Sequence, residues 1–347
     1  MNCYIGGKKI GLGCSTFIIA EMSGNHNGSL EQAIQIVHAV KQTGANAIKL
    51  QTYRPDTITL KTDNQDFKIP SESPWAKEES LYDLYEKAYT PWEWHKILFE
   101  EAKKVDLIIF SSPFDKTAVD LLEELDAPAY KIASPEITDI PLIKYVAQKG
   151  KPILLSTGMG QKEDIELAVE TIRKEGLEDI IILKCTSNYP TIHKDMNLKA
   201  IPRLKEDFNC LVGLSDHSTD YIAPVSATVL GASVIEKHFV ISKEEKTVDS
   251  FFSLNIKEFT DMVTMVRNTE AALGTDTYNL PDKINLKGRR SLYIAKDIQK
   301  GSKITENNIA SVRPGFGLHP KYYDQVISKI VNKNLKKGDR LKLEDLS

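Results

Sequence analysis

Eight short apolar runs recur along the first three quarters of the chain, and nearly all of them end in polar or ionisable residues. The runs cover 17–20, 47–50, 107–110, 129–132, 153–155, 180–183, 211–214 and 234–235. Segments with helical patterns separate them, such as 29–44, which opens on Ser29 as a helix cap. Strands that alternate with helices are typical of parallel βα units, and eight units predict an α/β fold of the closed (β/α)8, or TIM, barrel type. The active site of such a barrel lies at the C-terminal ends of its strands, so the residues that follow the runs form the candidate site.

The alternation is interrupted once and then ends. Segment 52–89 has no sustained period, and we expect it to cover a substrate at the barrel mouth. Segment 256–273 predicts a closing helix. Beyond it, 297–304 and 334–341 share a pattern of polar, apolar, polar, Lys, Gly, polar, basic and apolar residues, which predicts a small, mostly β domain of two related halves. We therefore divide the chain into a barrel domain at 1–274, a linker at 275–288 and a C-terminal domain at 289–347.

Composition narrows the class of protein. Of the 347 residues, 41% are hydrophobic and 27% are charged, which suits one barrel and a small second domain. A net charge of −3 gives no indication of a nucleic-acid or membrane partner. No segment approaches the roughly 20 apolar residues that span a bilayer, and 1–13 lacks a signal-peptide core, so we expect a cytoplasmic protein. The four cysteines show no C-x-x-C spacing and are expected to be reduced.

Two histidines follow the last two apolar runs. His217 and His238 would project from adjacent strand ends into one mouth, each beside a carboxylate, Asp216 or Glu236. Two imidazoles placed in this way can hold a divalent ion that acts as a Lewis acid on a carbonyl oxygen. A single histidine is more often structural, but a pair at equivalent positions favours a metal site.

Cations and hydroxyls gather at the other strand ends. The lysines are Lys49, Lys131 and Lys184, and the hydroxyls are those of Ser134, Ser156, Thr157 and Ser215. A lysine near the end of an apolar strand is costly unless it neutralises a charge, so this group predicts an anionic substrate such as a phosphorylated acid. The alternative is a set of salt bridges to Glu21, Glu136 and Glu236, and both can hold together.

Several motifs, in order, resemble the sialic acid synthase family. They lie at 19–28 (IAEMSGNHNG), 48–53 (IKLQTY), 130–134 (YKIAS), 156–159 (STGM), 213–217 (GLSDH) and 236–239 (EKHF). The C-terminal repeat, with RPGFG at 313–317, is similar to the antifreeze-like, SAF-type domain of that family. The segments most similar to its pseudaminic acid synthase branch are 53–57, 81–85, 90–95, 111–115 and 249–254.

The resemblance implies a transferase reaction. Phosphoenolpyruvate would condense with the open-chain aldehyde of 2,4-diacetamido-2,4,6-trideoxy-L-altrose, with water consumed and phosphate released. The resemblance also implies that His217 and His238 are catalytic and hold a divalent metal, Mn2+ first and Mg2+ or Co2+ as alternatives. Glu21 and Glu136 are the candidates for stabilising positive charge on the former enol carbon and for deprotonating water.

The resemblance further implies a set of substrate contacts. The residues expected to bind substrate are Lys49, Ser112, Lys131, Ser134, Ser156, Tyr189, Ser215, Glu236 and Asp249. Arg313, from the C-terminal domain of the second subunit of a homodimer, would reach the sugar. Ser187 stands where the family often has Asn, so no sugar contact is inferred there.

Three other functions remain open on the sequence. The same chemistry on another sugar would give N-acetylneuraminate or legionaminate. A metal-dependent aldolase would use pyruvate without releasing phosphate. A non-catalytic sugar-binding protein would release no phosphate from any substrate. Assays of phosphate release with each candidate sugar separate these possibilities.

Overall fold

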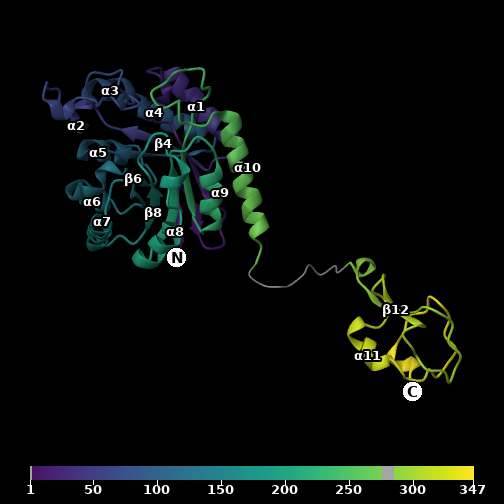
Figure 1. The fold of residues 1–347 in the computed structure, drawn as a ribbon. Coiled ribbons are helices and arrows are strands. Elements are labelled where there is room, and N and C mark those ends of the chain that lie inside the picture. Colours follow the sequence, from purple (N-terminus) through teal and green to yellow (C-terminus); the bar gives the residue numbers. More distant parts are fainter. Residues whose placement is uncertain (1, 276–284) are drawn as a thin grey trace. The chain divides into compact units, whose positions relative to one another are not determined.

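The computed structural model describes residues 2–275 and 285–347, and the chain divides into two compact units, Met1–Gly274 and Thr275–Ser347 (Figure 1). Of the linker predicted at 275–288, positions 276–284 lie outside the described residues. Each unit is described by itself. Among the described residues, no helix combines the length and the apolar character needed to cross a bilayer.

The first unit is a closed parallel barrel. Its strands are β3 (Phe17–Glu21), β4 (Ala47–Thr52), β5 (Ile108–Pro113), β6 (Tyr130–Ile132), β7 (Ile153–Ser156), β8 (Ile180–Cys185), β9 (Leu211–Asp216) and β10 (Val234–His238). They pair in the order β3 to β10, and β10 closes the ring by pairing in parallel with β3. Each predicted run forms a strand, so the predicted (β/α)8 barrel is confirmed.

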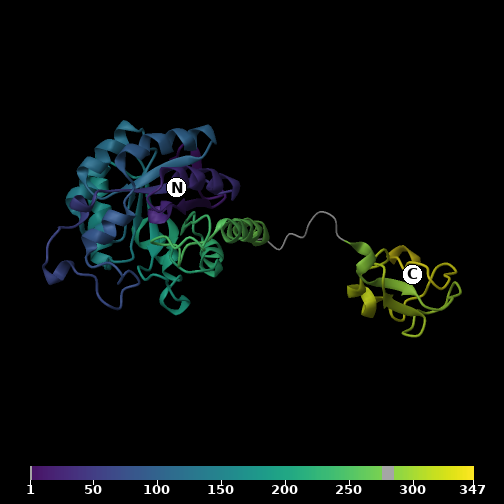
Figure 2. The ribbon, with the colours of Figure 1, turned by 90° about the horizontal axis from the view of Figure 1, so that it is seen from above.

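Helices surround the strands (Figure 2). They are α1 (Leu30–Gln42), α4 (Trp92–Lys104), α5 (Lys116–Glu124), α6 (Ile140–Ala147), α7 (Lys162–Lys174), α8 (Ala200–Phe208), α9 (Ile222–Val229) and α10 (Ile256–Leu273). Ser29 caps α1 by accepting a hydrogen bond from the Gln32 backbone, and α10 has the bounds that its pattern predicts. Alternate strand residues such as Ile18 and Ile48 pack against these helices.

The alternate strand residues that point into the barrel fill the part of its interior near the N-terminal ends of the strands. Phe17 and Ile19 lie in one buried apolar cluster with Ile5 and Ile10 of an N-terminal hairpin. That hairpin, β1 (Asn2–Ile5) paired with β2 (Lys8–Gly11), has positive φ at both of its turn glycines, as a tight two-residue turn requires. The sequence pattern of residues 2–11 predicted no hairpin. Because apolar side chains close this end of the barrel, space for a site remains at the carboxyl ends of the strands.

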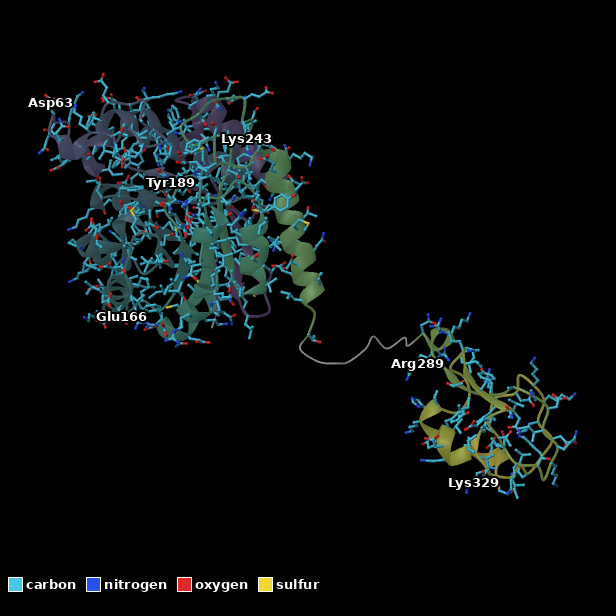
Figure 3. The ribbon with its side chains drawn as sticks, in the orientation of Figure 1. Asp63, Glu166, Tyr189, Lys243, Arg289 and Lys329 are labelled. Carbon is cyan, nitrogen blue, oxygen red and sulfur yellow. The ribbon has the colours of Figure 1, made fainter. Side chains whose placement is uncertain are left out.

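Segment 52–89 forms a long excursion after β4. It contains α2 (Pro55–Ile58), a short 3-10 turn at Gln65–Phe67 and α3 (Leu81–Ala88). Asp63, in this excursion, lies at the outer edge of the barrel unit (Figure 3). Ser80 caps α3 by accepting a hydrogen bond from the Asp83 backbone, which fixes where the helix begins.

The second unit is small and has its own core. Its strands β11 (Ser291–Ile294) and β12 (Ile309–Val312) pair antiparallel, and a short helix, α11 (Tyr323–Val326), follows. Ile298 and Leu335 occupy equivalent positions of the sequence repeat, and each donates its backbone N–H to the carbonyl of the other, at 2.8 and 2.9 Å. Both side chains are buried in the core of this unit.

Side chains of each half of the repeat accept hydrogen bonds from the backbone of the other half in the same reciprocal way. Asp297 accepts a hydrogen bond from the backbone of Lys337 at 2.8 Å, and Asn334 accepts one from the backbone of Lys300 at 2.7 Å. Asp297 and Asn334 are equivalent in the repeat, as are the two lysines. The repeated pattern therefore corresponds to two halves that cap each other's Lys-Gly turns.

Candidate active site

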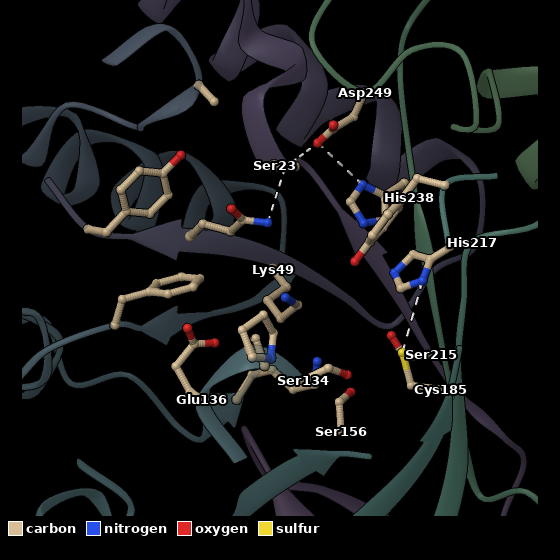
Figure 4. A pocket seen from close by; sticks show the side chains of 18 of the residues that line it. Ser23, Lys49, Ser134, Glu136, Ser156, Cys185, Ser215, His217, His238 and Asp249 are labelled. Carbon is tan, nitrogen blue, oxygen red and sulfur yellow. Dashed lines mark hydrogen bonds and ion pairs between the residues drawn. The ribbon is translucent and has the colours of Figure 1, made fainter. Parts of the chain in front are cut away.

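A cavity of about 390 Å³ lies among the strand ends and loops of the barrel unit (Figure 4). Of the residues predicted to form the site, those lining it are Lys49, Lys131, Ser134, Glu136, Ser156, Tyr189, Ser215, His217, Glu236, His238 and Asp249. They come from different strands and loops. Parallel strands that close into a barrel bring their carboxyl ends to one rim, which explains why residues so far apart in sequence meet here.

Two lysines and two glutamates form a buried charge network beside the cavity. Lys49 Nζ lies 2.5 Å from Glu21 Oε2 and 3.7 Å from Glu236 Oε1. Lys131 Nζ lies 3.1 Å from the same Glu236 oxygen. Burial acts to raise the pKa of Glu236, but Lys131 and Lys49 lower it to about 2. Glu236 is therefore ionised. The salt bridges to Glu21 and Glu236, which were the alternative to anion binding, form, and Lys49 and Lys131 line the cavity as well.

Glu21 and Ser112 do not line the cavity. Glu21 accepts hydrogen bonds from the Ser23 backbone at 3.0 Å and from Gln51 at 3.2 Å, in addition to its contact with Lys49. Ser112 Oγ accepts a hydrogen bond from Lys49 Nζ at 3.1 Å. Burial raises the pKa of Glu21, although Lys49 opposes this. In the geometry of the structure, both residues hold Lys49 rather than face a bound molecule.

Lys184 corrects one expectation. On β8 it alternates with Cys185, and it is Cys185 that lines the cavity. Lys184 Nζ donates to the Cys185 carbonyl at 2.6 Å and to Thr186 Oγ1 at 3.3 Å. The expectation that Lys184 joins the other two lysines at the mouth is therefore wrong, because neighbouring residues of a strand face opposite sides.

The hydroxyls differ in how well they are satisfied. Ser134 Oγ accepts a hydrogen bond from the Gly158 backbone at 3.0 Å, and Ser215 Oγ donates to Glu236 at 3.2 Å. Ser156 Oγ is buried without a hydrogen-bond partner. A Cβ on Gly158 would lie only 2.3 Å from Ser187 Oγ, so this close approach requires glycine. Ser156 thus presents an unused hydroxyl next to Ser134 and Lys131, a group of partners that suits an anion.

His217 and His238 lie beside each other on the side of the cavity opposite Glu136 in Figure 4. Their ring centroids are 5.3 Å apart. His217 Nδ1 donates to the Thr186 carbonyl at 3.0 Å, so Nε2 can accept when the ring is neutral. Burial acts to lower the pKa of His217, but Cys185 raises it. His238 Nδ1 is buried without a hydrogen-bond partner and lies 3.8 Å from Asp249 Oδ2. Burial, together with His217 and Lys49, holds the pKa of His238 well below its ordinary value, so this ring is neutral.

These two rings fit a divalent metal ion. Divalent ions commonly bind imidazole nitrogens, and a backbone carbonyl often orients the ring that binds. His238 is neutral and has an unsatisfied buried nitrogen, and the Thr186 carbonyl orients the ring of His217. Among the described residues, no cluster of three or more His, Cys, Asp or Glu side chains could hold a metal. Other positions around an ion at His217 and His238 would therefore be filled by water or substrate oxygens.

Cys185 is a cavity residue that the sequence analysis did not select. Its Sγ lies 4.0 Å from His217 Nδ1. Burial acts to raise the pKa of the thiol, but His217, Ser134 and Lys131 lower it to about 6. The two-residue alternation of β8 would have identified it, because it fixes Cys185 on the same face as the buried Leu183 and on the opposite face from Lys184.

Glu136 lies on a 3-10 turn, Pro135–Thr138, across the cavity from the histidines in Figure 4. Its Oε2 is buried without a hydrogen-bond partner. Burial raises the pKa of Glu136 to about 7. A carboxyl group with this pKa can exist in either protonation state near neutral pH, which suits proton transfer.

Loops complete the outer wall of the cavity. The excursion after β4 contributes the apolar side chains of Ile58, Trp75 and Leu84, and the loop after β10 contributes Phe252. The sequence predicted that 52–89 covers the mouth, and Leu84 and Phe252 lie in segments 81–85 and 249–254, which resemble the pseudaminic acid synthase branch. No cavity contact was predicted for any of the four, because 52–89 has no period that separates its two faces.

Asp249 and Arg313 complete the predicted set. Asp249 Oδ2 accepts a hydrogen bond from Ser23 Oγ at 2.5 Å, and burial raises the pKa of its carboxyl group to about 6. Arg313 follows β12 in the second unit, and its side chain is exposed there. Its expected contact with sugar stays a prediction.

Comparisons with known proteins agree with the predicted resemblance. Residues 36–278 match the NeuB family, and residues 289–347 match the SAF domain. The chain is 49% identical over 332 residues to a pseudaminic acid synthase of Campylobacter jejuni, covering 95% of this chain and 96% of that protein. It is 45% identical to a pseudaminic acid synthase of Helicobacter pylori, with 95% and 97% covered.

A solved structure extends the similarity to three dimensions. The N-acetylneuraminic acid synthetase of Leptospira borgpetersenii, in complex with citrate, superposes with a TM-score of 0.73 at 30% sequence identity, covering 81% of this chain and 93% of that one. The predicted membership of the sialic acid synthase family and the predicted SAF-type domain are confirmed. The chain belongs to the NeuB family.

Proposed function

We propose that this chain is a pseudaminic acid synthase. It condenses phosphoenolpyruvate with 2,4-diacetamido-2,4,6-trideoxy-L-altrose and water, and it releases phosphate. Two relatives that carry this name are 45% and 49% identical over almost the whole chain. The observation that carries the proposal is the cavity itself, which sets two lysines and the unsatisfied hydroxyl group of Ser156 against a pair of imidazoles.

The lysine side of the cavity binds phosphoenolpyruvate in this proposal. Lys131, Ser134 and Ser156 are placed to receive its carboxylate and phosphate oxygens. Lys49 also lines the cavity, and Glu21 and Ser112 fix its ammonium group from behind. Charge-assisted hydrogen bonds of this kind are stronger than neutral ones, and they offset the loss of hydration of the anion.

The histidine side receives the aldehyde. A divalent cation, Mn2+ in our proposal with Mg2+ or Co2+ as alternatives, would supply Lewis-acid polarisation of the carbonyl oxygen. His217 and His238 would hold it. Thr186 orients the His217 ring through the hydrogen bond to Nδ1, and Asp249 Oδ2 lies 3.8 Å from His238 Nδ1, beyond hydrogen-bond distance.

Carboxylates handle the positive charge and the water. Carbon–carbon bond formation leaves positive charge on the former enol carbon, and the ionised Glu236 lines the cavity where it can stabilise that charge. Glu136 accepts a proton from the attacking water, because its unpartnered oxygen and raised pKa suit a general base. Of the two carboxylates selected from sequence, Glu136 acts on substrate, and Glu21 positions Lys49.

We also propose a homodimer in which Arg313 of one subunit reaches the sugar in the cavity of the other. Residues 289–347 contain thirteen Lys and Arg against six Asp and Glu, whereas the chain as a whole has a net charge of −3. The rest of the chain is therefore negative, and opposite charges favour docking of the small domain on a barrel. Phosphoenolpyruvate is an intracellular metabolite, so we place the enzyme in the cytoplasm.

The test is phosphate release from phosphoenolpyruvate with Mn2+ and each of three sugars, namely the diacetamido trideoxy altrose and the precursors of N-acetylneuraminate and legionaminate. We expect the first to give the highest kcat/KM and a nine-carbon acid by mass spectrometry. Preference for another sugar would reassign the substrate, and pyruvate consumption without phosphate release would indicate an aldolase.

A matched pair of histidine variants separates catalysis from sugar binding. His217→Ala should abolish phosphate release, since it removes one of the two imidazoles proposed to hold the metal. His193→Ala is the control, because His193 is exposed and pairs with Asp220 at 3.0 Å. Sugar binding without phosphate release in the unmodified protein would support a non-catalytic function.

A further inference from the structure

Trp75 joins three loops at the outer wall of the cavity. It belongs to the excursion after β4, and its indole Nε1 donates to the Val248 carbonyl at 3.0 Å. Its ring contacts Tyr189, with centroids 5.4 Å apart, and Phe251, at 5.9 Å. These partners follow β8 and β10, so one side chain links the excursion to the loops beside both histidines.

The wall around Trp75 is apolar. Its single polar atom is used by Val248, so the indole presents only carbon surface to the cavity. Ile58, Leu84 and the buried Phe252 line the cavity with it. The unsatisfied buried groups of the cavity, such as Ser156 Oγ and His238 Nδ1, belong to its other parts.

Distances allow this wall to contact the far end of the sugar. The Tyr189 ring centroid is 4.4 Å from that of His217 and 5.4 Å from that of Trp75, so the Trp75 ring lies within about 10 Å of the His217 ring. An extended six-carbon chain measures about 6 Å between its end carbons, given carbon–carbon bonds of about 1.5 Å. A sugar with its aldehyde at the histidines and its chain directed toward the outer wall can therefore bring its last carbon to contact distance of Trp75, about 4 Å.

We propose that Trp75 is a specificity-determining residue that selects a sugar with a methyl group at C6 over one with a hydroxymethyl group. This inference rests on the proposed function and goes beyond it by assigning the choice to one side chain. A methyl group packs on the indole and gains from leaving water. A hydroxyl group against the indole loses its hydrogen bonds to water and gains none from Trp75, whose N–H is used by Val248, and an apolar pocket discriminates against an added hydroxyl by about 100-fold.

The test uses two sugars that differ at C6 alone, 2,4-diacetamido-2,4,6-trideoxy-L-altrose and its 6-hydroxy counterpart. Phosphate release gives kcat/KM for each. We expect the unmodified enzyme to favour the 6-deoxy sugar by about 100-fold. Trp75→Ala should reduce this preference at least tenfold, and Trp75→Gln, which puts an amide in place of part of the indole, should raise kcat/KM for the 6-hydroxy sugar.

Trp92→Phe is the matched control. Trp92 donates to the Tyr53 carbonyl at 3.1 Å and does not line the cavity, so its loss should leave the preference unchanged. An active enzyme whose preference is the same with Trp75, Ala or Gln at this position would overturn the inference while leaving the proposed function intact. An unmodified enzyme that releases no phosphate with either sugar would overturn the proposed function, and the inference with it.

A binding measurement covers the case in which Trp75→Ala does not fold. The 6-deoxy sugar should change the tryptophan fluorescence of the unmodified protein and of Trp92→Phe, because Trp75 is at the cavity in both. The change should be lost in Trp75→Phe, which keeps an apolar ring at the site. A full response in Trp75→Phe would place the sugar away from this wall and contradict the inference.

Discussion

At the scale of single residues, the unsatisfied buried atoms identify the site. Seven buried side-chain oxygen or nitrogen atoms lack a hydrogen-bond partner among the described residues, and four of them belong to residues that line the cavity, Glu136, Ser156, Glu236 and His238. Folded proteins satisfy most buried polar atoms because an unpaired one costs about 1–3 kcal/mol. Their concentration in and beside one cavity indicates groups kept for a ligand.

The pH dependence of the reaction should follow Glu136. Burial raises the pKa of its carboxyl group to about 7, so the carboxylate that accepts a proton from water forms as pH rises through that value. We expect kcat/KM to rise with pH and level off above about 7. Glu136→Gln should lower kcat/KM roughly 100-fold or more and remove that rise.

Stopped assays of phosphate release between pH 5.5 and 8.5 measure this. Glu166→Gln is the control, since Glu166 lies on the outer face of α7 and forms an ion pair with Lys162 at 3.1 Å. It should keep the profile of the unmodified enzyme. A Glu136→Gln profile that still rises near pH 7 would assign the base to another residue.

At the scale of elements, adjacent strands carry the two histidines and are tied together behind them. On β9 and β10, Ser215 and Glu236 face the cavity, whereas Asp216 and Lys237 face the helices. Lys237 Nζ lies 2.5 Å from Asp216 Oδ2 and also donates to both oxygens of Ser218. Because these residues precede His238 and His217, the pair fixes the relative position of the two strand ends.

Lys237→Met should destabilise the barrel by about 3–5 kcal/mol, because it leaves the Asp216 carboxylate buried without its cation. The double variant Asp216→Leu/Lys237→Met should recover much of this loss. Urea unfolding measures both. Mn2+ binding, followed by electron paramagnetic resonance, should weaken in both variants if the pair positions the histidines.

An exposed ion pair of equal length provides the comparison. Lys257 on α10 lies 2.5 Å from Asp261, yet the Lys257 side chain is 84% exposed and that of Asp261 is 43% exposed. Lys257→Met should leave the free energy of unfolding unchanged within error, because solvent screens surface pairs. Equal losses in Lys237→Met and Lys257→Met would show that burial does not decide the strength of this contact.

At the scale of the whole molecule, the chain combines a barrel that contains the cavity with a small basic unit. The small unit has its own core, centred on residues such as Ile298 and Leu335, and reciprocal caps between its halves. A core of that size supports a stable attachment more readily than an independent catalyst. In the proposed dimer, its part in the reaction therefore depends on the barrel that it docks against.

Arg313→Ala tests the proposed dimer. Removing a charge-assisted hydrogen bond to the sugar should raise the sugar KM or lower kcat, with kcat/KM falling about 10- to 100-fold. The variant should remain a dimer in sedimentation velocity, because the change leaves the core of the unit intact. Lys303→Ala removes an exposed charge from the same unit and should keep full activity. Unchanged kinetics in Arg313→Ala would remove this residue from the site.

The sequence determined the architecture. Eight apolar runs became eight strands because each is too short for a helix and is followed by a helical segment, and the repeated Lys-Gly pattern became two halves that cap each other. It also identified most of the cavity lining, since parallel strands that form a closed barrel have their carboxyl ends at one rim.

Only the tertiary structure decided which of these residues face a bound molecule. Cys185 and Lys184 are neighbours in sequence, but closure of the barrel turns the thiol inward and the ammonium group away. Glu21 and Lys49 both point inward, yet only the lysine lines the cavity. Trp75 belongs to a segment without a period, so contacts with distant loops alone set its place. Periodicity predicts which side chains of one strand share a face. How deeply a side chain is buried, and what it contacts, depends on how all the strands and loops pack in three dimensions.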